Sequence, residues 1–327
     1  MTQSNEDQRR RSVLSRALAE IRQVEVTDGP AAGSRILEVR TPTGLSLDIA
    51  LDRGGDISRM NYKGHELGWH SAADMATPWP VPDTEDGLGF LRGFDGFLVT
   101  CGLDHHGVAT QTDASNFKYP LRKQNHHPLH GRIMTAKAEV AEKHIDWDAV
   151  HIRIKTIARQ ASVFGEVLEL RRVFEISLET PTVKMIDEVA NMGFRPTRHG
   201  ILYHFNMGYP LLDSASRLTG DEWTLRNRLD GAGAVPDDNH VEIVDAKASP
   251  ADGRIGMIND SVGFGLTIGF DPKMLPATAL WRAFQSGVFA CGLEPQTVFD
   301  DANAGADMLQ GGAKRIYKLD LLVVETA

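Results

Sequence analysis

Hydrophobic and polar residues alternate along much of the chain with the period of a β-strand. Five segments show this pattern most clearly, with Gly, Pro, Asp and Asn turns between them: SRILEVRT, LSLDIAL, HIRIKTIARQ, EVLELRRVFEISLE and TVKMIDEVAN. Strand follows strand with few helices between. This excludes a doubly wound α/β fold, in which helices of about ten or more residues would separate the strands. The pattern predicts an all-β protein, a large antiparallel sandwich or barrel.

One helix is predicted, close to the N-terminus. From Arg10 to Arg22, apolar residues recur near the spacing of a single helix face. We expect a helical preamble over residues 1–24 and a single β domain over residues 25–327, because no composition break or flexible linker marks a second domain. The Pro- and Gly-rich stretch MATPWPVPDTEDGLGF, residues 75–90, is predicted to be a long loop of this domain, lying over a site.

The apolar run ILYHFNMGYP contains two polar side chains that share one face. In an extended chain alternate side chains point the same way, so His204 and Asn206 lie on the face of Leu202. The opposite face carries only apolar or aromatic side chains: Ile201, Tyr203, Phe205 and Met207. The polar pair is either satisfied inside a core or lines a cavity in which a ligand completes its hydrogen bonds.

Length, charge and cysteine content narrow the class of protein. A chain of 327 residues, 42% hydrophobic and 24% charged, can bury a large core. Its formal net charge of −9 argues against a nucleic-acid partner, which requires a basic face. No apolar run approaches the roughly 18 residues of a membrane span, and we expect no signal peptide. Two cysteines, Cys101 and Cys291, suit a reduced compartment, so a cytoplasmic protein with a small-molecule partner is expected.

Histidines cluster in the middle of the chain and raise the hypothesis of a metal site. They are His105, His106, His126, His127, His130, His199 and His204. Neutral imidazole is the commonest transition-metal ligand. The chain nevertheless has no H-E-x-x-H, C-x-x-C or facial-triad spacing, and several of these histidines occupy polar segments where exposure is expected. We therefore rank a bound catalytic metal below the acid–base chemistry that follows.

A glutamate in the stretch GLEPQTVFDDANAG is the clearest candidate for acid–base chemistry. Glu294 shares strand parity with Ala290 and Gly292, and such small neighbours leave space beside a carboxylate. A lone glutamate at a strand end is more often exposed, which is the competing interpretation. The segment VTCGLDHHG echoes FACGLEPQT and nominates a second carboxylate, Asp104.

The residues after Glu294 resemble the aldose 1-epimerase, or galactose mutarotase, superfamily. In that family the catalytic Glu is followed by Gln two residues on, Asp six on and Asn nine on; Gln296, Asp300 and Asn303 stand at these positions. The order of the three segments, His-Gly, then His-Phe-Asn, then Glu-x-Gln, is also that of the family.

Two earlier segments carry the rest of this resemblance. HHPLHGR is similar to the family's Asn-x-x-His-Gly element at His130 and Gly131, with Arg132 in place of a frequent second glycine. ILYHFNMGYP keeps His204 and Asn206 of the family's histidine strand, with shorter spacing. The chain is therefore identified as a divergent member of the superfamily.

The resemblance implies a galactose mutarotase-like β-sandwich that interconverts the α and β anomers of an aldose or modified sugar. It implies that Glu294 is the base and His204 the acid of ring opening, a reaction that needs one of each. Neither step requires a metal or an organic cofactor, so we expect none. It also implies a substrate-binding set, Arg53, Arg92, His130, Asn206 and Gln296, to which the internal echo adds Asp104. Trp69 and Trp79 either stack on the sugar ring or simply pack.

Two other functions remain open at this stage. A sugar isomerase or lyase on the same scaffold would use the same Glu and His to abstract a carbon-bound proton, and the DHHG segment would suit a metal-assisted version of it. A non-catalytic carbohydrate-binding protein would keep the arginines and aromatic residues but would not need an acid beside a base. The identity of the sugar and the oligomeric state, a homodimer included, are not readable from the sequence.

Overall fold

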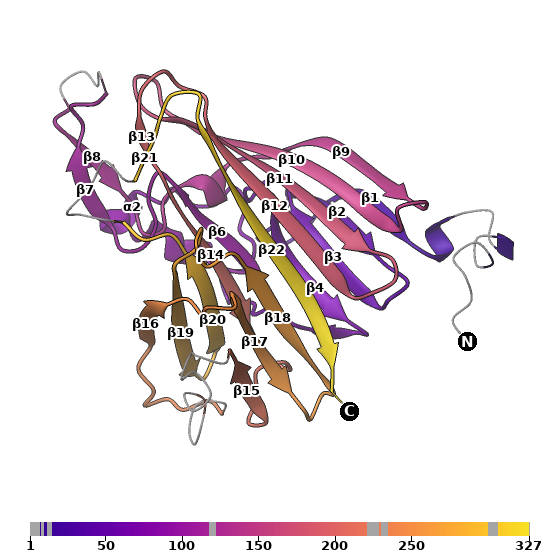
Figure 1. Ribbon diagram of the computed structural model, residues 1–327. Coiled ribbons are helices and arrows are strands. Elements are labelled where there is room, and N and C mark those ends of the chain that lie inside the picture. Colours follow the sequence, from indigo (N-terminus) through magenta and orange to yellow (C-terminus); the bar gives the residue numbers. More distant parts are fainter. Residues whose placement is uncertain are drawn as a thin grey trace.

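The computed structural model describes residues 15–117, 122–220, 229, 235–299 and 307–326, together with residues 7, 10 and 11. Three antiparallel sheets account for most of these residues (Figure 1). The largest has the strand order β15-β17-β18-β22-β12-β11-β10-β9. Its strands are β9 (Glu139–Asp146), β10 (His151–Ala161), β11 (Val167–Ser177), β12 (Thr182–Asn191), β15 (Ser216–Thr219), β17 (Arg254–Asn259), β18 (Phe264–Phe270) and β22 (Lys314–Glu325).

A second sheet, with the order β16-β19-β20-β14-β6, carries most of the candidate chemistry. Its strands are β6 (Leu98–Leu103), β14 (Gly200–Met207), β16 (Ile243–Ala248), β19 (Ala277–Gln285) and β20 (Val288–Gln296). The third sheet runs from β1 to β5 in chain order: β1 (Glu20–Glu25), β2 (Arg35–Arg40), β3 (Leu45–Ala50), β4 (Asp56–Tyr62) and β5 (His65–Glu66).

The remaining elements are short. Two small ladders pair β7 (Thr110–Asp113) with β8 (Gln124–His127) and β13 (Thr197–Arg198) with β21 (Met308–Leu309). The described helical turns are η1 (Ser15–Ala17), α2 (Thr84–Gly87), η2 (Gly89–Arg92) and η3 (Ile133–Thr135). The expected loop over residues 75–90 thus contains one short turn and the start of another. No helix among the described residues is long and apolar enough to cross a membrane.

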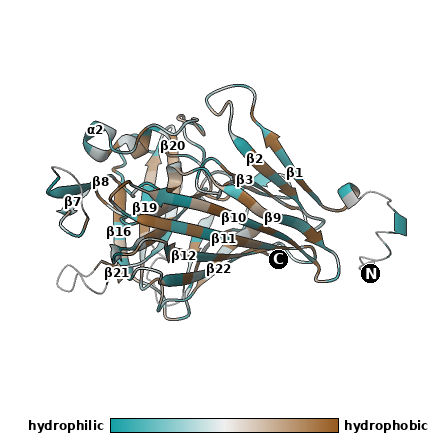
Figure 2. Ribbon diagram, turned by 90° about the horizontal axis from the view of Figure 1, so that it is seen from above, coloured by the Kyte–Doolittle hydropathy of each residue, from teal (hydrophilic) through white to brown (hydrophobic). Residues whose placement is uncertain are grey.

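The main core lies between the sheets and follows from the alternation seen in the sequence. On β10 and on most of β11, buried and partly exposed residues alternate. Figure 2 shows the matching change of hydropathy as teal and brown bands along both strands. One apolar cluster joins the inner faces of all three sheets, for example Leu47 from β3, Phe174 from β11 and Phe205 from β14. The five segments that predicted strands all form strands, and the prediction of an all-β antiparallel sandwich is confirmed.

The predicted helix from Arg10 to Arg22 is wrong in its C-terminal part. Residues 10 and 11 are helical and η1 follows, but β1 begins at Glu20 and pairs with β2 along its whole length. Residues 12–14 lie outside the described part of the chain. The apolar spacing near Ile21 fits a short strand as well as a helix, and pairing with β2 satisfies the backbone while Ile21 packs against the main core.

Candidate active site

A histidine and a glutamate meet at the centre of the second sheet. β14 pairs with β20 so that Asn206 lies opposite Gly292 and Phe205 opposite Leu293. This register places His204 beside Glu294, with 3.2 Å between Nε2 of the imidazole and Oε1 of the carboxylate. Both residues are buried, with 4% and 3% of their surface exposed.

The core-facing residues of β14 and β20 explain why His204 and Glu294 lie on the same face of the sheet. Tyr203 and Phe205 on β14, and Cys291 and Leu293 on β20, belong to the main core and hold one face of each strand inward. Their polar neighbours are therefore directed to the opposite face. Gly292 makes room there: a Cβ at that position would lie 2.9 Å from Oε1 of Glu294 and 3.0 Å from Cε1 of His204.

A third imidazole approaches the pair from a tight loop. His130 adopts a positive φ of 61°, and its ring centroid lies 5.6 Å from that of His204. The loop is fixed by main-chain hydrogen bonds: the N–H of Gly102 donates to the carbonyl of His130, and the N–H of Arg132 donates to the carbonyl of Gly102. A Cβ at Gly131 would lie 2.3 Å from the carbonyl oxygen of His105, so only glycine fits this turn.

Aromatic side chains surround the polar pair. Phe94 and Trp281 contact the His204 ring, with centroid distances of 4.9 and 5.5 Å. Trp69 packs against both of these residues, and Phe90 lies 4.8 Å from the ring of His130. These rings form a second apolar cluster, distinct from the main core, and give the pair a low-polarity environment.

This environment determines the protonation of the pair. Burial, with a smaller contribution from the charge of Glu242, raises the pKa of Glu294 to about 8. Burial and the nearby His130 lower the pKa of His204 well below its ordinary value. The two groups together therefore hold one proton at neutral pH, and at 3.2 Å that proton belongs to the pair rather than to either residue. One acid and one base are thus adjacent.

Three further predicted residues, Asn206, Arg53 and Gln296, lie on the strands of the pair or contact the segment that carries Phe94. Asn206 is fully buried and its amide donates to the carbonyl of Gly96, while its Oδ1 has no hydrogen-bond partner. Arg53 is buried, stacks 3.9 Å over Trp79, and donates to the carbonyls of Gly93 and Asp95. Burial lowers the pKa of its guanidinium to about 10.

Gln296 ends β20 on the face of Glu294 and is partly buried. Trp69 and Trp79 are both buried in the second apolar cluster. Asp300 and Asn303, which completed the family spacing, lie outside the described residues.

Two predicted substrate-binding residues are not brought to the pair. The side chain of Arg92 is 65% exposed and forms an ion pair with Glu85. Asp104 lines a cavity of about 330 Å³ whose walls include His127 but neither His204 nor Glu294. Although burial raises it, contacts with His127 and Gln160 lower the pKa of Asp104 to about 2. The sequence echo placed Asp104 at a strand end, but the residue of β6 opposite His204 is Val99, and Asp104 follows the other end of that strand, beyond Leu103 opposite Gly200.

Among the clustered histidines outside the pair, His126 is exposed as expected, but several others are buried. His105, His106 and His127 are all buried, so the expectation of exposure is wrong for them. His106 accepts from or donates to the hydroxyl of Thr297 and stacks on Phe299. Among the described residues, no group of three or more His, Cys, Asp or Glu side chains is arranged to hold a metal ion.

Two residues of the site were missed at the sequence level. Trp281 lies on β19 opposite Gly292, and its alternation with Ala279 and Ala283 is a signal that could have placed it on the face of Glu294. Phe94 lies in an irregular segment, where no period assigns a side chain to a face.

Comparison of the whole chain with solved structures agrees with this architecture. A protein from Klebsiella pneumoniae, provisionally described as an aldose 1-epimerase, is 21% identical with a TM-score of 0.80, over 94% of this chain and 84% of that one. A galactose mutarotase-like protein from Clostridium acetobutylicum is 14% identical with a TM-score of 0.65, over 95% and 100%. Galactose 1-epimerase from Lactobacillus acidophilus is 13% identical with a TM-score of 0.58, over 94% and 99%. The fold is that of the galactose mutarotase-like proteins, so the resemblance seen in the sequence is confirmed at the level of the fold.

At the level of sequence families, residues 31–321 match a family described as a domain of unknown function, DUF4432. The chain belongs to this family. No curated protein matches the sequence.

Proposed function

We propose that this protein is a sugar 1-epimerase that interconverts the α and β anomers of an aldose or modified sugar. The observation that carries the proposal is the buried contact between Nε2 of His204 and Oε1 of Glu294, on a galactose mutarotase-like fold. The pair supplies one acid and one base side by side, which is the requirement of hemiacetal opening. The third imidazole, His130, lies next to the same pair.

Ring opening uses the single proton of the pair and returns it. In the reactive arrangement the shared proton lies on His204, so that the carboxylate of Glu294 takes the proton from the anomeric hydroxyl while the imidazolium of His204 donates a proton to the ring oxygen. The bond between C1 and the ring oxygen breaks, and its electron pair stays on that oxygen. After rotation about C1–C2, the opposite transfers close the ring on the other face of the aldehyde. The pair ends with the proton count with which it began.

Polar atoms without a partner in the protein indicate where sugar hydroxyls would be bound. Nδ1 of His130, Nδ1 of His204 and Oδ1 of Asn206 are buried and have no hydrogen-bond partner among the described residues. Buried polar groups are normally paired, so a ligand with several hydroxyls would complete them. Phe94 and Trp281 would contact the C–H face of the sugar ring, while Gln296 and Arg53 would bind hydroxyls farther from C1.

The test is anomer exchange followed by proton NMR on purified protein. A panel of aldoses, deoxy sugars, uronic acids and sulfonated sugars is presented, and the α and β anomeric signals are followed by saturation transfer. We expect faster exchange on one class of sugar, and a decrease of about 100-fold to 10,000-fold in Glu294→Gln and in His204→Gln, with sugar affinity nearly retained.

Other outcomes would replace the proposal. A new product signal in place of exchange would indicate the isomerase or lyase alternative, in which the same pair moves a carbon-bound proton. Sugar binding without any turnover in the wild type would indicate a binding protein. Arg92→Gln is a useful comparison in the same panel: because its side chain is exposed and paired with Glu85, we expect little change in exchange rate.

A further inference from the structure

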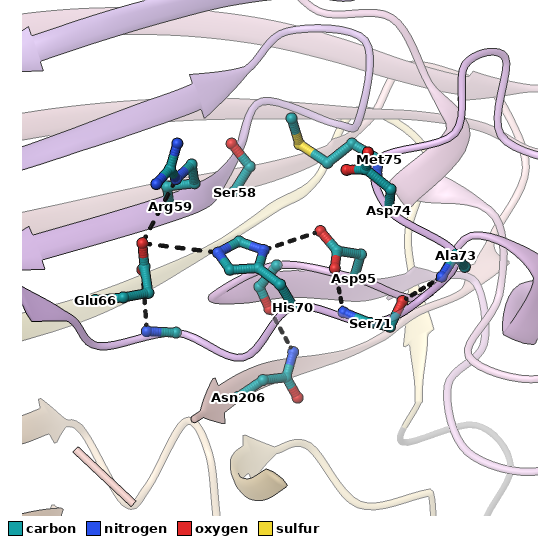
Figure 3. Close-up of polar contacts among 12 residues, drawn as sticks. Ser58, Arg59, Glu66, His70, Ser71, Ala73, Asp74, Met75, Asp95 and Asn206 are labelled. Atoms are coloured by element: carbon teal, nitrogen blue, oxygen red, sulfur yellow. Dashed lines mark hydrogen bonds and ion pairs between the residues drawn. The ribbon is translucent and has the colours of Figure 1, made fainter. Parts of the chain in front are cut away.

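Behind the aromatic rings of the site lies an ion-pair network that the chemistry above does not use. Figure 3 shows the ring of His70 between the carboxylates of Glu66 and Asp95. Nδ1 of His70 lies 3.2 Å from Oδ2 of Asp95, and Nε2 lies 3.7 Å from Oε2 of Glu66. The other oxygen of Asp95 accepts a 2.6 Å hydrogen bond from the N–H of Ser71.

Two dipeptides, Trp69-His70 and Phe94-Asp95, each supply one aromatic ring to the site and one residue to the ion-pair network. Trp69 and Phe94 pack against each other, and Phe94 contacts His204. The residues that follow them in the chain, His70 and Asp95, form the ion pair with each other. The N–H of Gly96 also donates to the carbonyl of Trp69. The ion pair therefore ties together the two segments whose aromatic rings lie beside the catalytic pair.

The segment of Asp95 also holds the predicted binding residues. The main-chain carbonyls of Gly93 and Asp95 accept from the guanidinium of Arg53, and the carbonyl of Gly96 accepts a 2.8 Å hydrogen bond from the amide of Asn206. Three residues of the proposed site thus contact four consecutive residues that have no strand ladder of their own: Arg53 and Asn206 by hydrogen bonds, and His204 through Phe94. A shift of this segment would change the contacts of all three.

The charges of His70 and Asp95 favour one fixed arrangement of the two segments. Contacts with Asp95 and Glu66 raise the pKa of His70 to about 9, so the imidazole is a cation at neutral pH. Asp95 has no exposed side-chain surface and His70 is 37% exposed. Because the carboxylate of Asp95 is fully buried, leaving it without the His70 cation would be costly, and this favours the one geometry in which the two groups meet.

We propose that His70 and Asp95 are positioning residues, which hold Phe94, Asn206 and Arg53 in place around the His204–Glu294 pair. This role rests on the proposed function for its effect on rate. Neither side chain contacts the pair itself, so both act through the segment from Gly93 to Gly96. Misplacement of reacting groups by about 1 Å can reduce a rate roughly 100-fold.

The test is a double-mutant cycle on anomer exchange with His70→Gln, Asp95→Asn and the double variant. Asp95→Asn keeps an acceptor for the N–H of Ser71, and His70→Gln keeps a donor, so each removes mainly the charge. We expect each single variant to lower kcat by about 10-fold to 100-fold with a smaller change in KM, and the double variant to be no worse than the more damaging single one. His144→Gln is the matched control, because His144 forms an exposed pair with Glu142 on β9.

A second readout separates failure of this inference from failure of the proposed function. The His204 ring lies 4.9 Å from Phe94, so its C2-proton resonance in a histidine-labelled sample reports the position of that ring without any sugar. We expect this resonance, assigned with His204→Gln, to shift in His70→Gln and Asp95→Asn but not in His144→Gln. Unchanged kcat together with an unchanged resonance would overturn the positioning role. If the wild type accelerates no sugar, the resonance alone decides: a shift in the two variants supports the positioning role of His70 and Asp95, and no shift overturns it.

Discussion

At the scale of single residues, burial explains the chemistry of the site. A carboxyl and an imidazole that are removed from water both favour their neutral forms, so the pKa of Glu294 rises to about 8 and that of His204 falls. Opposite shifts on adjacent groups are typical of acid–base sites. They also mean that the pair gains or loses protons as a unit.

The first residue-scale prediction concerns the pH dependence of activity. The competent state of the pair carries one proton. It loses that proton as the pH rises through about 8, so kcat/KM for anomer exchange should be level near neutrality and fall about tenfold per pH unit above about 8. Exchange rates measured from pH 5 to pH 10 test this. A rate that keeps rising above pH 8 would contradict the one-proton mechanism.

The second residue-scale prediction concerns stability. In the unfolded chain Glu294 ionises near its ordinary pKa, whereas in the folded protein it stays protonated to about pH 8. The folded state therefore loses stability relative to the unfolded state as the pH rises from about 4.5 to 8. Glu294→Gln removes this loss and should raise the free energy of unfolding by about 1–3 kcal/mol at pH 7, with no gain near pH 4. Urea unfolding at pH 4 and pH 7 measures this difference in the free energy of unfolding, and Glu38→Gln, at a partly exposed glutamate, is the control. Equal stability of Glu294→Gln and the wild type at pH 7 would argue against a buried, protonated Glu294.

At the scale of elements, the register between β14 and β20 brings the pair together. Each strand is held by apolar residues on its core face, and the other face is free to carry His204, Asn206 and Glu294. Small residues on β20 provide the space that these side chains occupy, and Gly292 is the tightest of them. The candidate site on β20 therefore depends on the space left by Gly292 as well as on the carboxylate of Glu294.

We predict that Gly292→Ala reduces exchange activity by about 10-fold to 100-fold while the protein still folds. The new methyl group would lie within 3.0 Å of both members of the pair, so the imidazole and the carboxylate must separate. The comparison is Gly269→Ala on β18, where the nearest atom to an added Cβ is 3.6 Å away. Activity assays and circular dichroism on both variants decide; equal activity would show that the site relaxes around the methyl group.

At the scale of the whole molecule, one buried arginine links the sheets behind the site. Arg172 on β11 donates to Asp187 on β12, to Asp56 on β4 and to the hydroxyl of Thr100 on β6. The hydroxyl of Tyr203, next to His204 on β14, donates to Asp187 as well. All three sheets that form the sandwich therefore meet at one guanidinium.

Arg172→Met should lower the free energy of unfolding by about 3–5 kcal/mol, because it leaves Asp56 and Asp187 buried without their cation. Arg22→Met is the control, since Arg22 forms a surface pair with Glu38 and should change stability by less than about 1 kcal/mol. Denaturant unfolding measures both. A loss of similar size in the two variants would show that the network is not what joins the sheets.

The sequence alone determined the all-β class, the main strands and the faces of β14 and β20, because a period of two along a strand assigns each side chain to a face. Family spacing also singled out His130, His204 and Glu294, which the fold brings together. What only the tertiary structure decided is which other residues join them. Phe94, Trp281 and the His70–Asp95 pair come from distant or irregular segments, while Arg92 and Asp104 lie elsewhere. Contacts between such segments depend on sheet register and loop path, which no local pattern encodes.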